Sequence, residues 1–160
     1  MTRDIFISIK GIQITLPEND AVEVITKGKF YKKNGKTYVS YEELDESNEV
    51  IKCMLKYDDN RIEISRNTAG MNTCLVFERD KYCTSSYKTL FGNMLVGFNT
   101  KKMDIIETEK CIRIDIDYSM DINYSYVSDC NVAIKIAADY DELNKDNELT
   151  GCKFIKWYRR

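Results

Sequence analysis

The chain has 160 residues, of which 43% are hydrophobic and 31% are charged, and its formal net charge is −2. This length and mixture are those of one ordinary folded domain and exclude a disordered or fibrous protein. The slightly negative charge provides no overall attraction to nucleic acid or to an anionic membrane, so we expect neither as a partner.

The N-terminal third shows apolar residues at every second position, which is typical of half-buried strands. The first such run covers residues 5–9, and the apolar phase is reversed in residues 12–16. Because one extra residue moves a strand's apolar set to its other face, we expect a bulge or sharp bend at Gly11. A second run covers residues 22–30, and Asn34-Gly35 after it predicts a tight hairpin.

The same period of two continues through the rest of the chain. Asp58-Asp59-Asn60 predicts another turn, and apolar faces recur over residues 94–100, 112–122 and 130–136. A short acidic helix is conceivable only over residues 137–147. About ten short strands predict an all-β fold, a closed antiparallel β-barrel of about 8–10 strands. We expect residues 1–138 to form the barrel and residues 139–160 to be an acidic segment and a basic, aromatic tail that packs on it.

The sequence lacks the residues that several kinds of catalytic and metal-binding chemistry require. There is no histidine, which removes the commonest general base, the Ser-His and Cys-His nucleophile pairs and most zinc sites. No two of the six cysteines form a Cys-x-x-Cys pair, and no phosphate-loop, dinucleotide or calcium-loop pattern occurs. We therefore expect no enzyme activity, no metal and no cofactor. The apolar stretch over residues 5–9 is too short for a secretion signal, so we expect a cytoplasmic protein with reduced cysteines.

A family resemblance rests on several segments taken in order. These are Thr26-Lys27-Gly28-Lys29-Phe30-Tyr31, Tyr38-Val39-Ser40-Tyr41-Glu42-Glu43, Ile64-Ser65-Arg66, Tyr87-Lys88-Thr89-Leu90-Phe91-Gly92-Asn93-Met94 with Asn99-Thr100, and Ile112-Arg113-Ile114-Asp115-Ile116-Asp117-Tyr118. Over about residues 4–138 the chain resembles the YwiB-like family of uncharacterised bacterial proteins. That resemblance implies a calycin-like barrel, similar in shape to lipocalins and fatty-acid-binding proteins, and it implies no activity.

Arg66 is the candidate binding residue because it continues the apolar phase of Ile62 and Ile64. A buried guanidinium cannot lose its proton, so it needs a carboxylate, carbonyls, water or an anionic ligand. Barrels of the fatty-acid-binding type hold a carboxylate with an inward arginine and tyrosines, which makes the ligand-binding candidates Arg66, Tyr57, Tyr87 and Tyr118. The alternative is structural, since Arg66 lies near a strand end where it could bind backbone carbonyls at a barrel opening.

Two functions remain open at this point. The first is a barrel that binds a small amphipathic or anionic ligand, without catalysis. The second is a protein-interaction or structural module with a filled core and no ligand, because large side chains such as Phe98 and Tyr118 fall on the inward phase. The tail over residues 153–160 alternates basic and aromatic residues, and we expect Trp157 to be partly buried on the barrel rather than kept for nucleic acid or a membrane surface. The sequence does not set the oligomeric state.

Overall fold

The structure is a computed structural model that describes residues 2–11, 23–44, 47–68, 71–89, 92–143 and 156–157. Side chains are described for all of these except residues 68, 71, 88, 89, 156 and 157. Strands dominate the described residues, and helical geometry is confined to one turn over residues 140–143. The all-β prediction is therefore confirmed.

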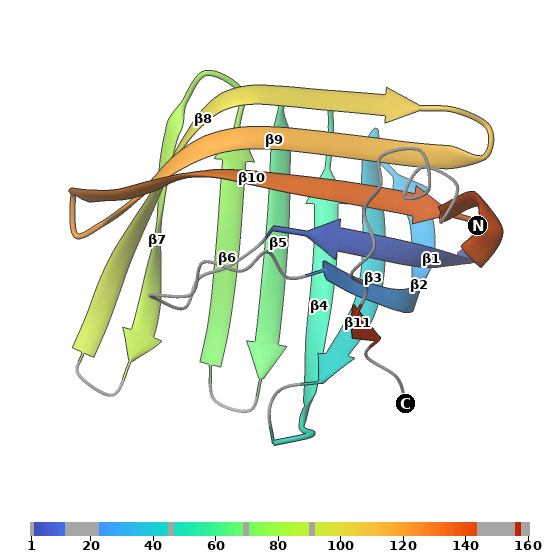
Figure 1. Cartoon of the computed structure of the whole chain (residues 1–160), viewed down its shortest axis with the longest axis horizontal. Coiled ribbons are helices and arrows are strands. Elements are labelled where there is room, and N and C mark those ends of the chain that lie inside the picture. The colour runs from blue at the N-terminus through green and yellow to red at the C-terminus, as the bar shows by residue number, and fades with distance from the viewer. Residues whose placement is uncertain are drawn as a thin grey trace.

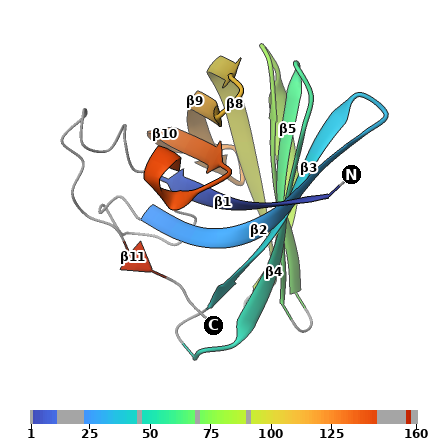
Figure 2. The ribbon, with the colours of Figure 1, turned by 90° about the vertical axis from the view of Figure 1, so that its right-hand side faces the viewer.

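Ten antiparallel strands follow one another around a nearly closed barrel in the order β6-β5-β4-β3-β2-β1-β10-β9-β8-β7. Figures 1 and 2 show the strands from the side and turned by 90°. The strands are β1 (Arg3–Lys10), β2 (Glu23–Lys33), β3 (Lys36–Leu44), β4 (Val50–Tyr57), β5 (Arg61–Thr68), β6 (Met71–Glu78), β7 (Tyr82–Thr89), β8 (Gly92–Glu107), β9 (Cys111–Ile122) and β10 (Ser125–Ala137).

The two ends of this order, β6 and β7, are consecutive in the chain and lie side by side (Figure 1). A turn joins them, in which the Lys81 amide donates to the Glu78 carbonyl at 3.0 Å. No ladder of backbone hydrogen bonds connects these two strands in the part of the chain that the structure describes. At this seam the barrel is therefore closed only because β6 lies next to β7. A ladder of backbone hydrogen bonds joins every other pair of neighbouring strands in this order.

Local turn chemistry explains several of the connections. Asn34 (φ 54°) and Gly35 (φ 77°) both adopt the left-handed conformation, as the predicted hairpin requires. The Asp58 carboxylate accepts hydrogen bonds from the amides of Asn60 and Arg61 at 2.9 and 3.0 Å. Gly11 ends β1 with φ 102°, and a Cβ there would lie 2.2 Å from the Asn131 carbonyl oxygen, so only glycine fits. The residues after it, 12–22, lie outside the described residues.

The core fills the middle of the barrel. All ten strands contribute buried apolar side chains to a single cluster. At its centre the rings of Phe77, Phe98 and Tyr118 contact one another with centroid separations of 4.7–5.8 Å. Their exposures are 0%, 0% and 2%. Aromatic rings packed at these distances leave no continuous channel along the barrel axis.

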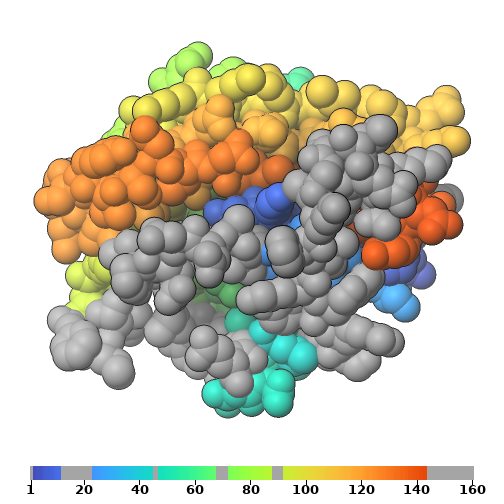
Figure 3. Space-filling view, viewed as in Figure 1, coloured from blue at the N-terminus to red at the C-terminus, as the bar shows by residue number. Residues whose placement is uncertain are grey.

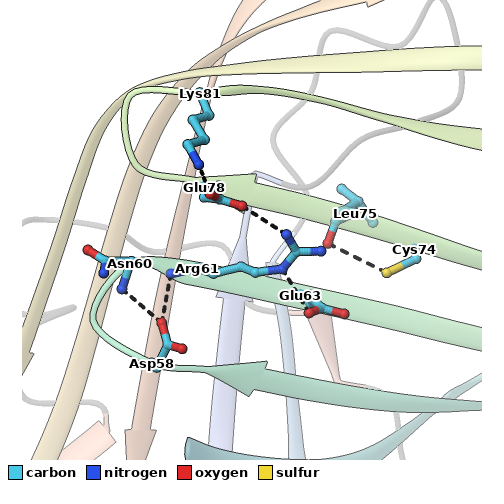
Figure 4. A network of polar contacts seen from close by, with 8 residues as sticks. All are labelled: Asp58, Asn60, Arg61, Glu63, Cys74, Leu75, Glu78 and Lys81. Carbon is cyan, nitrogen blue, oxygen red and sulfur yellow. Dashed lines mark hydrogen bonds and ion pairs between the residues drawn. The ribbon is translucent and has the colours of Figure 1, made fainter.

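The outer wall carries most of the charge. Arg61 binds Glu63 at 3.0 Å and Glu78 at 2.8 Å, and Lys81 binds the other oxygen of Glu78 at 2.8 Å (Figure 4). These side chains are 22–67% exposed, so each pair contributes little to the free energy of unfolding.

The chain returns to the outer face of the barrel after β10. Leu143, in the helical turn, is fully buried against Ile25 and Ala137. The two-residue strand β11 (Lys156–Trp157) then pairs in parallel with Val24 and Ile25 of β2. This edge of β2 is available because β3 pairs with β2 only from Gly28 onward. The backbone of Trp157 thus lies on the barrel, and its side chain lies outside the described part.

Candidate functional site

Arg66 lies on β5, where it is paired with Cys53 on β4 and Thr73 on β6. It shares the inward phase of Ile62 and Ile64, which are 0% and 1% exposed. The Arg66 side chain itself is 31% exposed because it stands at one opening of the barrel. Its Nη2 donates a hydrogen bond to Oε1 of Glu43 at 3.2 Å.

Glu43 connects Arg66 to a buried thiol. The Cys53 Sγ lies 3.5 Å from Oε2 of Glu43, and the Glu43 side chain is only 13% exposed. Burial, with the Glu43 charge adding to it, raises the pKa of the Cys53 thiol to about 12. The thiol is therefore neutral at ordinary pH. Together, Glu43, Cys53 and Arg66 form what we call the Arg66 cluster, in which a carboxylate rather than backbone carbonyls accepts from Nη2, while the buried Nε of Arg66 makes no hydrogen bond among the described residues.

Of the three predicted tyrosine partners, two are buried beyond reach of bulk water. Tyr87 is 5% exposed, and its hydroxyl makes no hydrogen bond among the described residues. Tyr118 belongs to the aromatic centre of the core. Burial raises the pKa of both phenols above their ordinary value, so both are neutral. Neither tyrosine has a hydrogen bond to Arg66 in the structure.

The third tyrosine, Tyr57, is at the opposite opening. Its strand β4 carries Cys53 four residues earlier, which separates Tyr57 from the Arg66 cluster by about 13 Å along the strand. The Tyr57 hydroxyl donates to Oε1 of Glu107 at 3.0 Å, and Lys32 Nζ donates to Oε2 of the same carboxylate at 3.3 Å. Burial, strengthened by the Glu107 hydrogen bond, raises the pKa of Tyr57. Arg66 and Tyr57 thus lie at opposite ends of the barrel, and Tyr118 lies in the aromatic centre of the core.

A hollow of about 540 Å³ is present at this second opening. Its floor consists of inward-facing side chains from three strands, and its rim carries charged residues from the turns. We call it the Tyr57 opening. It is lined by Lys32, Lys33, Asn34, Gly35, Thr37, Tyr57, Asp58, Asp59, Ile105 and Glu107.

Sequence reasoning missed Glu107 because a bulge changes the phase of β8. Up to Thr100 the buried residues occupy even positions, and the register then shifts between Thr100 and Lys102. Beyond the shift the inward residues are Met103, Ile105 and Glu107, the last of which reaches Tyr57. The signal was present in the sequence, since apolar residues change from even to odd positions between Phe98 and Met103.

The described residues set limits on the chemistry of both openings. Within the described ranges, no cluster of three or more Cys, Asp or Glu side chains is placed to hold a metal ion. Cys53, Cys74, Cys83, Cys111 and Cys130 are all free thiols, and Cys152 lies outside these ranges. None of the described helical residues forms a helix long and apolar enough to cross a membrane.

Comparison with known proteins agrees with this fold. A family model described as "Domain of unknown function (DUF1934)" matches residues 7–134. The solved crystal structure of the ywiB protein from Bacillus subtilis is similar, with a TM-score of 0.70 and 23% sequence identity. The similarity covers 86% of this chain and 93% of that one. At this identity the likeness shows the fold alone. No curated protein matches the chain.

Proposed function

Since this chain belongs to the DUF1934 family, whose function is unknown, we propose from its geometry that it is a non-catalytic barrel that binds a small amphipathic or anionic molecule. The observation that carries this proposal is the hollow at the Tyr57 opening. Its volume of about 540 Å³ falls within the range of small-molecule sites, roughly 300–1,000 Å³. Tyr57 and Ile105 provide an apolar surface in this hollow, and most of its other lining residues are polar or charged.

The lining suggests how a ligand would be oriented. Lys32 and Lys33 stand on the rim, and Lys33 makes no ion pair among the described residues. An acidic group of the ligand would therefore bind next to these two ammonium groups. The apolar part would cover Ile105 and the ring of Tyr57, which form the floor. The Asp58 carboxylate is already engaged by two backbone amides, so it competes little for the lysines.

Binding at the Tyr57 opening fits the structure better than binding at Arg66. The guanidinium already contacts Glu43. At the Tyr57 opening, Lys32 contacts Glu107 but Lys33 makes no ion pair among the described residues, so only there can an incoming carboxylate bind a cation without displacing a protein carboxylate. The aromatic centre of the core also separates the two openings, so the ligand is expected to be short. A long acyl chain running through the barrel does not fit this packing.

The protonation states of the interior side chains support the part of this proposal that the barrel is not catalytic. Burial raises the pKa of the Cys53 thiol and of the Tyr57, Tyr87 and Tyr118 phenols, so none is poised to exchange a proton near neutral pH. The sequence also has no histidine. A reducing compartment suits the free cysteines, and we include a cytoplasmic location in the proposal.

The test uses 8-anilinonaphthalene-1-sulfonate, a fluorescent amphipathic anion, titrated into the folded protein. We expect saturable 1:1 binding, weakened at least about ten-fold by the double substitution Lys32→Gln/Lys33→Gln because two charge-assisted contacts are lost. Lys29→Gln is the matched control, since Lys29 is on the same strand and pairs with Asp4 outside the hollow. Native mass spectrometry of the purified protein would then reveal any natural ligand. Equal affinity in the double variant and the control would contradict the proposal.

A second candidate function is favoured by one observation, the contact of Phe77, Phe98 and Tyr118 across the barrel. A barrel filled in this way can serve as a rigid module for protein interaction or structure without any ligand. Absence of both dye binding and a co-purified molecule, in a protein that unfolds cooperatively, would favour this candidate.

A further inference from the structure

Three exposed tyrosines gather near the end of the β9–β10 hairpin, on the outer wall of the barrel. Tyr82 is 45% exposed, Tyr124 74% and Tyr126 67%. The hairpin end extends past β7 in Figure 1 and forms the left-hand edge of the molecule in Figure 3. We call Tyr82, Asp121, Tyr124 and Tyr126 the tyrosine surface. Large aromatic groups gathered on an outer wall are typical of recognition sites.

Asp121 lies between two of these rings. The Tyr82 hydroxyl donates a hydrogen bond to Oδ1 of Asp121 at 2.9 Å. On the other side, Tyr126 is directly opposite Asp121 across the β9–β10 ladder, so both side chains share one face. The Tyr82 ring reaches Asp121 across Gly97, where an added Cβ would lie 2.1 Å from the phenol oxygen. A carboxylate is thus flanked by aromatic side chains.

Tyr124 is held in an unfavourable backbone conformation. Its φ is 67°, in the left-handed region that glycine normally occupies at the second position of such a turn. Two hydrogen bonds fix the turn, from the Leu95 amide to Asn123 Oδ1 at 3.1 Å and from the Asn123 amide to the Leu95 carbonyl at 2.7 Å. The strained tyrosine is nonetheless 74% exposed, so burial within the barrel does not offset the strain. Strain of this kind is often kept at sites of recognition.

The charge of the tyrosine surface indicates which chemical group of a partner it would bind. Asp121 makes no ion pair among the described residues. Further along the same face of β9, Asp117 and Asp115 lie about 13 and 20 Å from Asp121 and both accept from the Asn131 amide. Lys101 pairs with Asp129 between them and Asp121. A carboxylate between tyrosine rings matches a cation, which gains Coulomb attraction and contact with the ring faces. The Asp121 carboxylate, which has no cationic partner among the described residues, disfavours the phosphates of nucleic acid.

We propose that the tyrosine surface binds an arginine or lysine side chain on an exposed segment of a partner protein. The cation is placed against Asp121, between the rings of Tyr82 and Tyr126. Tyr124, fixed at the end of the hairpin, covers the neighbouring part of the bound segment. This site does not depend on ligand binding at the Tyr57 opening, because the two are built from different strands.

The test measures fluorescence anisotropy of a labelled six-residue peptide of alternating arginine and glycine, at low salt. We expect saturable binding that weakens about ten-fold or more when glutamine replaces arginine, or when the protein carries Asp121→Asn, which retains a side-chain oxygen for Tyr82. Tyr126→Ser should weaken it about five-fold. Ile106→Ser is the control, because Ile106 is 57% exposed on β8 but is not part of the tyrosine surface.

Tyr124→Gly separates recognition from stability. Glycine relieves the backbone strain, so this variant should melt at a higher temperature while binding the peptide several-fold more weakly. Four results would overturn the proposal: no saturable binding, equal binding by Asp121→Asn, equally tight binding of free tetramethylammonium, or self-association of the protein that Tyr126→Ser abolishes. The last two would assign the surface to a small cation or to a second copy of the chain.

Discussion

Replacing Arg66 by methionine removes a charge from the inner side of the barrel while keeping most of the apolar length of the side chain. The Glu43 carboxylate then loses the guanidinium that lies 3.2 Å away, although the Glu43 side chain remains only 13% exposed. An unpaired carboxylate at this depth raises the free energy of the folded state, because the little water that reaches it only partly replaces the lost partner.

The magnitude follows from the burial of the two groups. Removing one partner of a fully buried ion pair costs about 3–5 kcal/mol. Arg66 is 31% exposed, so solvent screening reduces this to about 2 kcal/mol. For a domain of this size, about 2 kcal/mol corresponds to a melting temperature lower by about 4–8 °C.

The assay is a double-mutant cycle followed by circular dichroism in urea and on heating. Arg66→Met combined with Glu43→Gln should recover most of the loss, since no unpaired charge remains. Arg61→Met is the control, because Arg61 forms two exposed ion pairs and should cost less than about 1 kcal/mol. An unchanged melting temperature for Arg66→Met would refute the structural role of the cluster. If dye binding were lost at the same time, the ligand would be assigned to Arg66 instead.

The remaining predictions concern ionisation, packing and the tail. Burial raises the pKa of the Cys53 thiol to about 12 and also raises the pKa of Tyr57, so the unfolded chain releases these protons at lower pH. The free energy of unfolding should therefore be constant up to about pH 9 and fall above it, and an equal urea midpoint at pH 8 and 10.5 would contradict this. Gly97→Ala should displace the Tyr82 ring, whose hydroxyl would lie 2.1 Å from the new Cβ, and lower the urea stability by about 1 kcal/mol. Trp157 should emit at a shorter wavelength than free indole and shift to the red on unfolding; emission at the free-indole wavelength before and after unfolding would show that it is solvated.

Short-range patterns in the sequence determined which segments are strands and which face of each strand is inward. The alternation over residues 112–122 corresponds to β9, and Asn34-Gly35 forms the hairpin turn that joins β2 to β3. The inward phase of Arg66 also follows from its own strand, because side chains two residues apart share a face whatever the neighbouring strand is. These features depend on contacts between residues close in sequence, so a single chain is enough to predict them.

The partners of these side chains were decided only by the tertiary structure. Glu43 meets Arg66 because β3, β4 and β5 are neighbours in a specific register, and the residues lie 23 positions apart in the chain. Glu107 reaches Tyr57 because a bulge turns the end of β8 inward, and the two lie 50 positions apart. The alternation of side chains along a strand determines which face of the sheet a side chain lies on. It does not determine how far along the barrel axis that side chain lies. Tyr57 and Arg66 therefore share an inward phase yet stand at opposite openings, because register, bulges and strand order place side chains along the axis.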